Sequence, residues 1–140
     1  MRTLLLGAIG LAAISLAVAQ SQKANPNFTG GEVNRLDVPK NATMVRFRFE
    51  PGARTKWHTH SVNQIISVEE GVALHQVKGG PVVLLKAGQT IMVGAGVMHW
   101  HGAAPDKGGT QFNITQGDPE WGPEVTDAEY RAKPIELKLP

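Results

Sequence analysis

Between residues 41 and 115, short segments of β-branched, aliphatic and aromatic residues alternate with turns rich in glycine, proline and aspartate. Strand segments of about four to eight residues at near-regular spacing are typical of an all-β sandwich or barrel, not of a βαβ fold. No long segment has a helical period. We therefore predict strands at Thr43–Phe49, Asn63–Val68, Val72–Val77, Val82–Leu85, Gln89–Val93, His99–Ala103 and Thr110–Thr115.

The turn signals include Glu70-Gly71, which is expected to separate the second strand from the third. One segment favours a helix instead. Val125–Arg131 begins with Thr126, which can cap a helix, and Glu129 stands three residues later, where it completes a capping box. The sequence thus predicts a single helical turn behind the strands.

The N-terminus has the pattern of a secretory signal peptide. Arg2 precedes an apolar run from Leu4 to Leu16, and the small residues at 17–19 form a cleavage signature before Gln20. An uncleaved anchor is the alternative. We predict a signal peptide over residues 1–19, an N-terminal arm over 20–40 and one domain over 41–140. The expected location is secreted or periplasmic, with no membrane attachment after cleavage.

Charge and cysteine content restrict the partners. The formal net charge is +2 and no run of lysine or arginine is present, which argues against nucleic acid as a partner. The chain has no cysteine, so disulfides and thiolate ligands are excluded. A small-molecule substrate is the expected partner.

Four of the five histidines form two pairs, His58/His60 and His99/His101. Residues two apart on a strand project to the same side, so each pair can direct two imidazoles at one point. Gln64 can add a carbonyl oxygen. Three nitrogens and one oxygen around a divalent metal, with open positions left over, describe a catalytic and not a structural site. The fifth histidine, His75, is interpreted as structural.

The spacing of these residues resembles the two motifs of the cupin family. The first motif is G-x5-H-x-H-x3-Q-x6-G, from Gly52 to Gly71, and the second is G-x5-G-x-G-x2-H, from Gly88 to His99. The chain departs from the family pattern at Gln64, where glutamate is usual, at Gly94, where proline is usual, and at Ala103, where asparagine is usual. The resemblance implies a jelly-roll barrel, the double-stranded β-helix, and assembly into a homo-oligomer.

The segments at 49–60, 99–105 and 125–131 resemble small single-domain cupins related to carboxymuconolactone decarboxylase-type proteins, a group that includes bacterial manganese-dependent hydroxynitrile lyases. The resemblance implies manganese held by His58, His60, Gln64 and His99, with iron, nickel, cobalt and zinc as alternatives. It also places His101 in the pocket. Those lyases carry a further histidine where this chain has Gln111. Because His101 shares the face of His99 and an imidazole titrates near neutrality, we expect His101 to move the proton, while Gln111 orients substrate or water.

Strand parity also predicts the cavity wall. Val45, Phe47 and Phe49 share one face of their strand and are expected to line the cavity. In Thr110–Thr115, either the polar or the apolar face can look inward. The leading hypothesis is a Lewis-acid lyase or decarboxylase acting on a small carbonyl-type substrate. A metal-dependent dioxygenase and a non-catalytic module that binds a small ligand or metal are the alternatives.

Overall fold

The computed structural model describes residues 41–137 of the 140-residue chain. This part contains nine strands and one helix, which confirms the prediction of an all-β fold. In chain order they are β1 (Ala42–Phe49), β2 (His58–Thr59), β3 (Gln64–Val77), β4 (Val83–Lys86), β5 (Thr90–Val93), β6 (His99–Gly102), β7 (Gly109–Gln116), β8 (Glu120–Trp121), α1 (Asp127–Tyr130) and β9 (Ile135–Glu136). The predicted signal peptide and N-terminal arm lie outside the described residues. Within the described range, no helix has the length and hydrophobicity that a membrane span requires.

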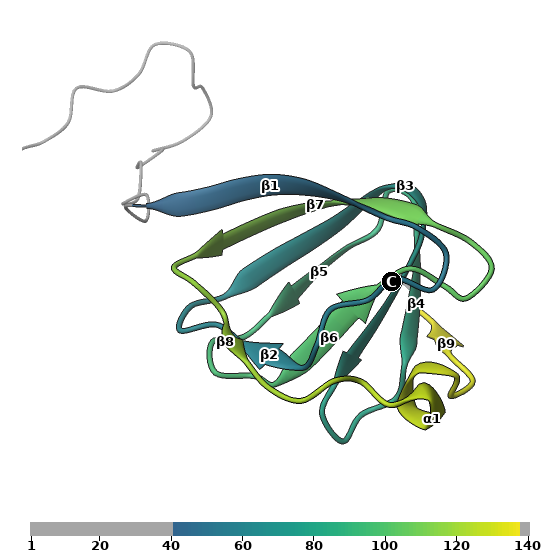
Figure 1. Cartoon of the computed structure of the whole chain (residues 1–140). Coiled ribbons are helices and arrows are strands. Elements are labelled where there is room, and N and C mark those ends of the chain that lie inside the picture. Colours follow the sequence, from purple (N-terminus) through teal and green to yellow (C-terminus); the bar gives the residue numbers. More distant parts are fainter. Residues whose placement is uncertain (1–40, 138–140) are drawn as a thin grey trace, which may run out of the picture. The chain divides into compact units, whose positions relative to one another are not determined.

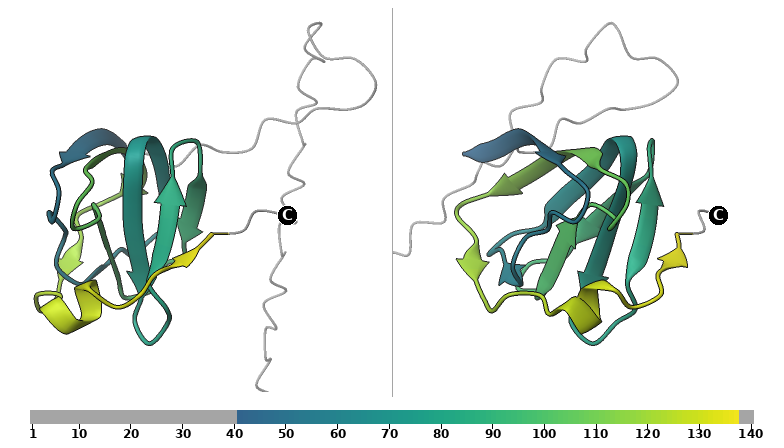
Figure 2. Two further views of the ribbon diagram at one scale, coloured as in Figure 1. Left: turned by 90° about the vertical axis from the view of Figure 1, so that its right-hand side faces the viewer. Right: turned by 45° about the vertical axis from the view of Figure 1, so that its right-hand side comes forward.

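The strands form one curled sheet. Its main path runs β1-β7-β3-β6-β2-β8, and β4, β5 and β9 join it beside β3 and β4. All pairs are antiparallel except β4 with β9. Figures 1 and 2 show that the sheet curls into a half-barrel, so the end strands β1 and β8 come round toward the same opening. Residues far apart in the sequence therefore face one interior.

The prediction of two strands separated by a turn at Glu70-Gly71 is wrong, because β3 runs unbroken through both segments. The register of β3 against β7 shifts between Val68 and Glu70, which marks a β-bulge. Gly71 continues the irregularity with φ +69°, a conformation that glycine adopts without strain. A bulge bends a strand and shifts which residues face inward. The first half of β3 pairs with β5, and the second half pairs with β4 and β6.

The helical turn was predicted correctly. Thr126 Oγ1 accepts a hydrogen bond from the Glu129 backbone N–H at 3.2 Å, and the Glu129 carboxylate accepts one from the Thr126 N–H at 2.9 Å. Tyr130 anchors the turn by donating its hydroxyl proton to the backbone oxygen of Ala103 at 2.9 Å. The main apolar cluster behind the site comprises Trp57, Leu74, Val82, Trp100, Ala104, Val125 and Tyr130. Trp57 and Trp100, the sequence neighbours of His58 and His99, thus belong to the core.

Candidate metal centre

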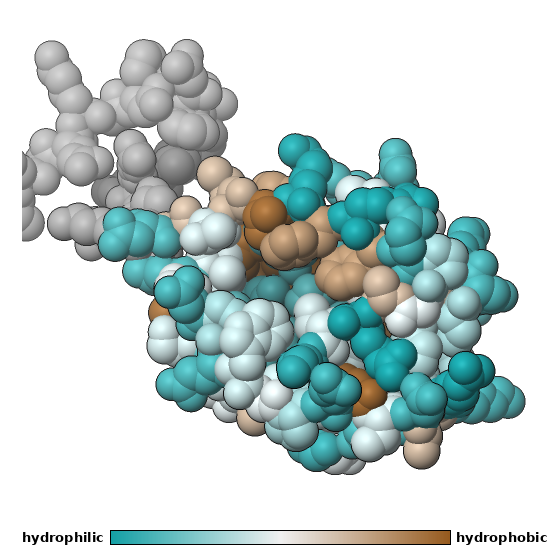
Figure 3. Space-filling model, in the orientation of Figure 1, coloured by the Kyte–Doolittle hydropathy of each residue, from teal (hydrophilic) through white to brown (hydrophobic). Residues whose placement is uncertain are grey.

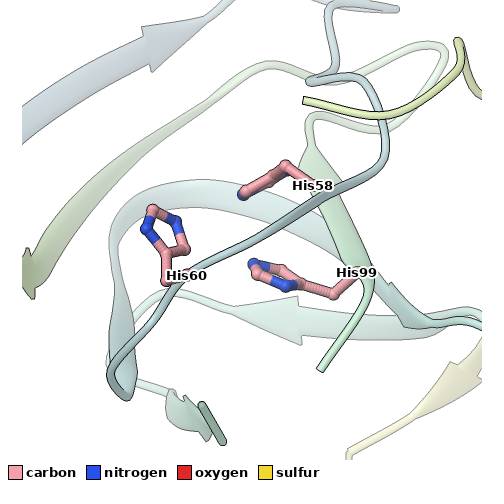
Figure 4. A group of neighbouring side chains, drawn as sticks. All are labelled: His58, His60 and His99. Atoms are coloured by element: carbon pink, nitrogen blue, oxygen red, sulfur yellow. The ribbon is translucent and has the colours of Figure 1, made fainter. Parts of the chain in front are cut away.

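Strand pairing brings the histidine pairs together. His58 lies on β2 directly opposite His99 on β6, and their ring centroids are 4.2 Å apart. His60 follows β2 and its ring lies 5.2 Å from that of His58. One ring nitrogen from each of these three buried histidines lies within 4.8 Å of the other two (Figure 4). The three residues could hold a metal ion, as the alternation of side chains along the strands predicted.

Backbone carbonyls determine which nitrogen of two rings faces the centre. His58 Nδ1 lies 2.9 Å from the oxygen of Lys56, and His99 Nδ1 lies 2.9 Å from the oxygen of Val97. A carbonyl oxygen only accepts, so each Nδ1 must carry the proton. The Nε2 lone pairs of His58 and His99 are then free to bind a cation. Such outer hydrogen bonds are the usual means of orienting a metal-binding imidazole.

Gln64 faces the same point, and a chain of hydrogen bonds sets its orientation. Asn113 Nδ2 donates to the backbone oxygen of Gln111 at 3.2 Å, so Asn113 Oδ1 is the atom that accepts from Gln64 Nε2, also at 3.2 Å. Gln64 Oε1 consequently points at His99 Nε2, 2.8 Å away. Because His99 carries its proton on Nδ1, two lone pairs face each other without a proton between them.

A divalent cation held by both atoms would resolve this juxtaposition, because each lone pair would then face a positive charge. Protonation of His99 is the alternative, but burial lowers the pKa of His99 to about 4. Burial also lowers the pKa values of His58 and His60. All three rings are therefore neutral at pH 7, as a metal ligand must be, so the residues fit a metal.

His101 projects from the same face of β6 as His99, and the two rings are nearly parallel at 6.1 Å. Its Nδ1 lies 2.8 Å from Gln111 Oε1, while Gln111 Nε2 donates to the backbone oxygen of Gly102 at 3.0 Å. This second bond fixes the amide, so His101 must donate from Nδ1 and keep its Nε2 lone pair. The fully buried Gln111 stands behind His101 and outside the pocket lining, where it contacts His101 and not the substrate space.

Three further residues that strand spacing does not assign to the site lie beside it. Asn113 holds Gln64, and Thr115 Oγ1 lies 3.2 Å from His60 Nδ1. Both come from the polar face of β7, which parity alone had left undecided. His75 was interpreted as structural, yet its ring lies 5.8 Å from that of His99 and its buried Nε2 has no hydrogen-bond partner among the described residues. All five histidines of the chain thus meet in one interior.

A pocket of about 400 Å³ opens beside the histidines. Val45, Phe47 and Phe49 form its wall on the β1 side, as strand parity predicted, and hydrophobic side chains gather around this hollow in Figure 3. His58, His60, Gln64 and His101 line the inner part. Trp121 and the loop at 117–119 complete the opposite side. The pocket gives a small, largely apolar molecule access to the candidate metal ligands.

This chain resembles several known proteins. It is similar to the (R)-mandelonitrile lyase of Granulicella tundricola, with 40% identity over 87 residues that make up 59% of this chain and 66% of that enzyme, just under two thirds of its length. A cupin-like protein from Thermotoga maritima is 41% identical, with a TM-score of 0.63 over 65% of this chain and 71% of that one. The polyketide cyclase RemF from Streptomyces resistomycificus is 18% identical, with a TM-score of 0.53 over 66% of each chain, a likeness of fold alone.

Residues 45–113 match the Cupin domain family. This segment begins within β1 and ends within β7, so it contains β2 to β6 and the candidate ligands. Together with the 41% identical cupin-like structure, it establishes that the chain belongs to the cupin family.

Proposed function

We propose that this chain is an exported, metal-dependent lyase that cleaves a small cyanohydrin into a carbonyl compound and hydrogen cyanide. The observation that carries the proposal is the 2.8 Å approach of Gln64 Oε1 to His99 Nε2 beside two further buried histidines. The 40% identical relative is named as an (R)-mandelonitrile lyase, which supports lyase chemistry on a small molecule.

The metal ligands in this proposal are His58, His60, Gln64 and His99. Three imidazoles and an amide oxygen carry no charge, so a bound divalent ion keeps its full positive charge. Manganese is our first choice, and iron, nickel, cobalt and zinc accept the same donor set. When bound, the metal would supply Lewis acidity, which stabilises negative charge on the substrate oxygen or on the departing cyanide.

His101 is the proton-transfer residue in this scheme. The hydrogen bond from its Nδ1 to Gln111 leaves Nε2 as the acceptor, and the residue lines the pocket. Burial, with the neighbouring His58, keeps the pKa of His101 well below 6.5, so the ring is neutral and able to accept at pH 7. Nε2 takes the proton of the substrate hydroxyl, the carbon–carbon bond breaks, and cyanide leaves with the electron pair. The imidazolium then returns the proton to cyanide.

Gln111 acts as a positioning residue. Its amide holds one tautomer of His101, much as a carboxylate orients the histidine of a hydrolytic triad. An amide accepts a hydrogen bond without taking the proton, so His101 alone carries the acid–base role. This differs from the expectation that Gln111 orients substrate or water, because its side chain lies behind the imidazole.

The test is metal analysis of the protein purified from its native compartment, followed by assay of that form with mandelonitrile. We expect about one divalent ion per chain and release of benzaldehyde and cyanide. Metal binding without turnover of any cyanohydrin would favour the non-catalytic binding module. Oxygen consumption in an iron- or copper-loaded form would favour the dioxygenase. Export is tested on the same material, since mass spectrometry should find an N-terminus at Gln20.

A further inference from the structure

Trp121 is an exposed aromatic residue next to the candidate ligands. It lies on β8 directly opposite His58, so both side chains share one face of the pair. The ring centroids are 5.0 Å apart, and the Trp121 side chain lines the pocket. Yet Trp121 is 61% exposed, whereas Trp57 and Trp100 are 1% and 0% exposed. Trp121 therefore presents an aromatic face to any molecule that enters the pocket.

Phe47 occupies the corresponding place on the other side of the pocket. It lies on β1, the opposite end of the main strand path, and is 47% exposed. The half-barrel curl brings these two sheet ends to one opening (Figure 1). Phe47 packs edge-on against Phe49 at 6.1 Å, and Phe49 packs edge-on against His101 at 5.7 Å. Since the ring centroids of His101 and His58 are 5.4 Å apart, a continuous arc of rings runs from Phe47 to Trp121.

The charges of the pocket indicate how a ligand is held. Among the described residues that line it, none is a lysine or arginine, and Asp118 at the mouth is the one carboxylate. Away from the histidines, the lining thus offers no cationic side chain to pair with a carboxylate or phosphate group. Aromatic faces and apolar contacts are what remain for binding the part of a molecule that does not reach the histidines.

We propose that Trp121 and Phe47 form an aromatic clamp that selects uncharged substrates with a flat, unsaturated ring over saturated ones of equal size. The inference rests on the proposed function, in that the substrate's reacting group is taken to lie at the histidine cluster. Trp121, supplied by β8 beyond the segment that matches the cupin family, is the main specificity determinant.

Binding is measured first, without turnover. Benzyl alcohol and cyclohexylmethanol share a hydroxymethyl group and ring size but differ in unsaturation. Trp121 is the accessible tryptophan, so protection of its fluorescence from acrylamide reports occupancy in the native protein. Ligand-observed NMR titrations give the same affinities for variants that lack the reporter. Native protein should bind benzyl alcohol roughly 3- to 10-fold more tightly, the ratio that an aromatic contact supports.

Variants then assign the preference to the clamp. Trp121→Ala and Phe47→Ala should reduce the ratio toward one, and Trp121→Phe should keep most of it. Met92→Ala is the matched control, because Met92 is 68% exposed and does not line the pocket. With mandelonitrile and its cyclohexyl analogue, Trp121→Ala should raise KM for the aryl substrate with little change in kcat. Circular dichroism confirms that each variant is folded.

The two proposals fail separately. A native protein that binds both alcohols equally, or a Trp121→Ala variant that keeps the full preference, would overturn the clamp even if cyanohydrins are cleaved. Preferential binding of benzyl alcohol that depends on Trp121, without cleavage of any cyanohydrin, would support the clamp and overturn the lyase.

Discussion

Replacing Gln64 with glutamate should weaken anion binding at the metal, because it adds one negative charge to a neutral set of ligands. Gln64 Oε1 lies 2.8 Å from His99 Nε2, so the new carboxylate would occupy the coordination shell itself. An anion bound at a neighbouring position would then lie about 4 Å from the added charge. The repulsion at that distance is about 1 kcal/mol with the screening of bulk water and about 4 kcal/mol at the effective dielectric constant of a partly buried site.

These energies correspond to a loss of azide affinity of roughly 5- to 1,000-fold. The same change should raise the pKa of metal-bound water. The assay is a titration of azide against native protein and the Gln64→Glu variant, each analysed for metal so that equal loading is assured. A pH titration of the loaded forms follows the bound water.

Gln76→Glu is the matched control on the same strand. Gln76 accepts from Trp100 Nε1 and donates to the oxygen of Gly80, both at 2.8 Å, and does not line the pocket. Glutamate at this position adds the same charge outside the centre, so azide affinity should change little. Unchanged or tighter azide binding in fully loaded Gln64→Glu would show that Gln64 is not a metal ligand.

Three other results are expected. His60→Ala should lose the metal, so saturating Mn²⁺ should no longer raise its Tm. In the native protein, Mn²⁺ at about 100 times Kd should stabilise the fold by about 2.7 kcal/mol, which raises Tm by at least about 10 °C. Full metal occupancy in the variant would refute the ligand assignment. His101→Ala should keep its metal but lose roughly 10²- to 10⁴-fold in turnover, the usual range for a general base. An undiminished rate in His101→Ala would defeat the proton-transfer role. Lys78 and the Thr126 cap lower the pKa of Glu129 from 4.5 to about 2, so its carboxylate stabilises the fold above about pH 4.5 and loses this effect as the pH falls toward 2. The difference in unfolding free energy between native protein and Glu129→Gln, measured by urea unfolding, should therefore shrink on acidification. A constant difference would contradict the ion pair.

Much of the site was predictable because its geometry is local. The alternation of side chains along a strand places His58 with His60 and His99 with His101 in any β fold. The apolar wall at Val45, Phe47 and Phe49 follows from the same rule. Turn residues predicted most of the strands for a similar reason, since turn preferences act within a few residues.

The long strand β3 shows where local reasoning ends. Glycine with a positive φ is used both in tight turns and in bulges, so the sequence Glu70-Gly71 is compatible with either structure. The pairing of β3 with four neighbours decides in favour of a bulge. The bulge also shifts the inward face, so that Gln64 in the first half and His75 in the second both reach the interior. For this reason the place of His75 could not be read from strand parity.

The sequence by itself determined the β class, the helix cap, and the two histidine pairs with their companion Gln64, because each depends on spacings of a few residues. Only the tertiary structure decided that the polar face of β7 looks inward, where Asn113 orients Gln64 and Gln111 orients His101. It also decided that Trp121 stands over His58. These contacts join residues 10 to 63 positions apart, and the curl of the whole sheet, not any local preference, brings them together.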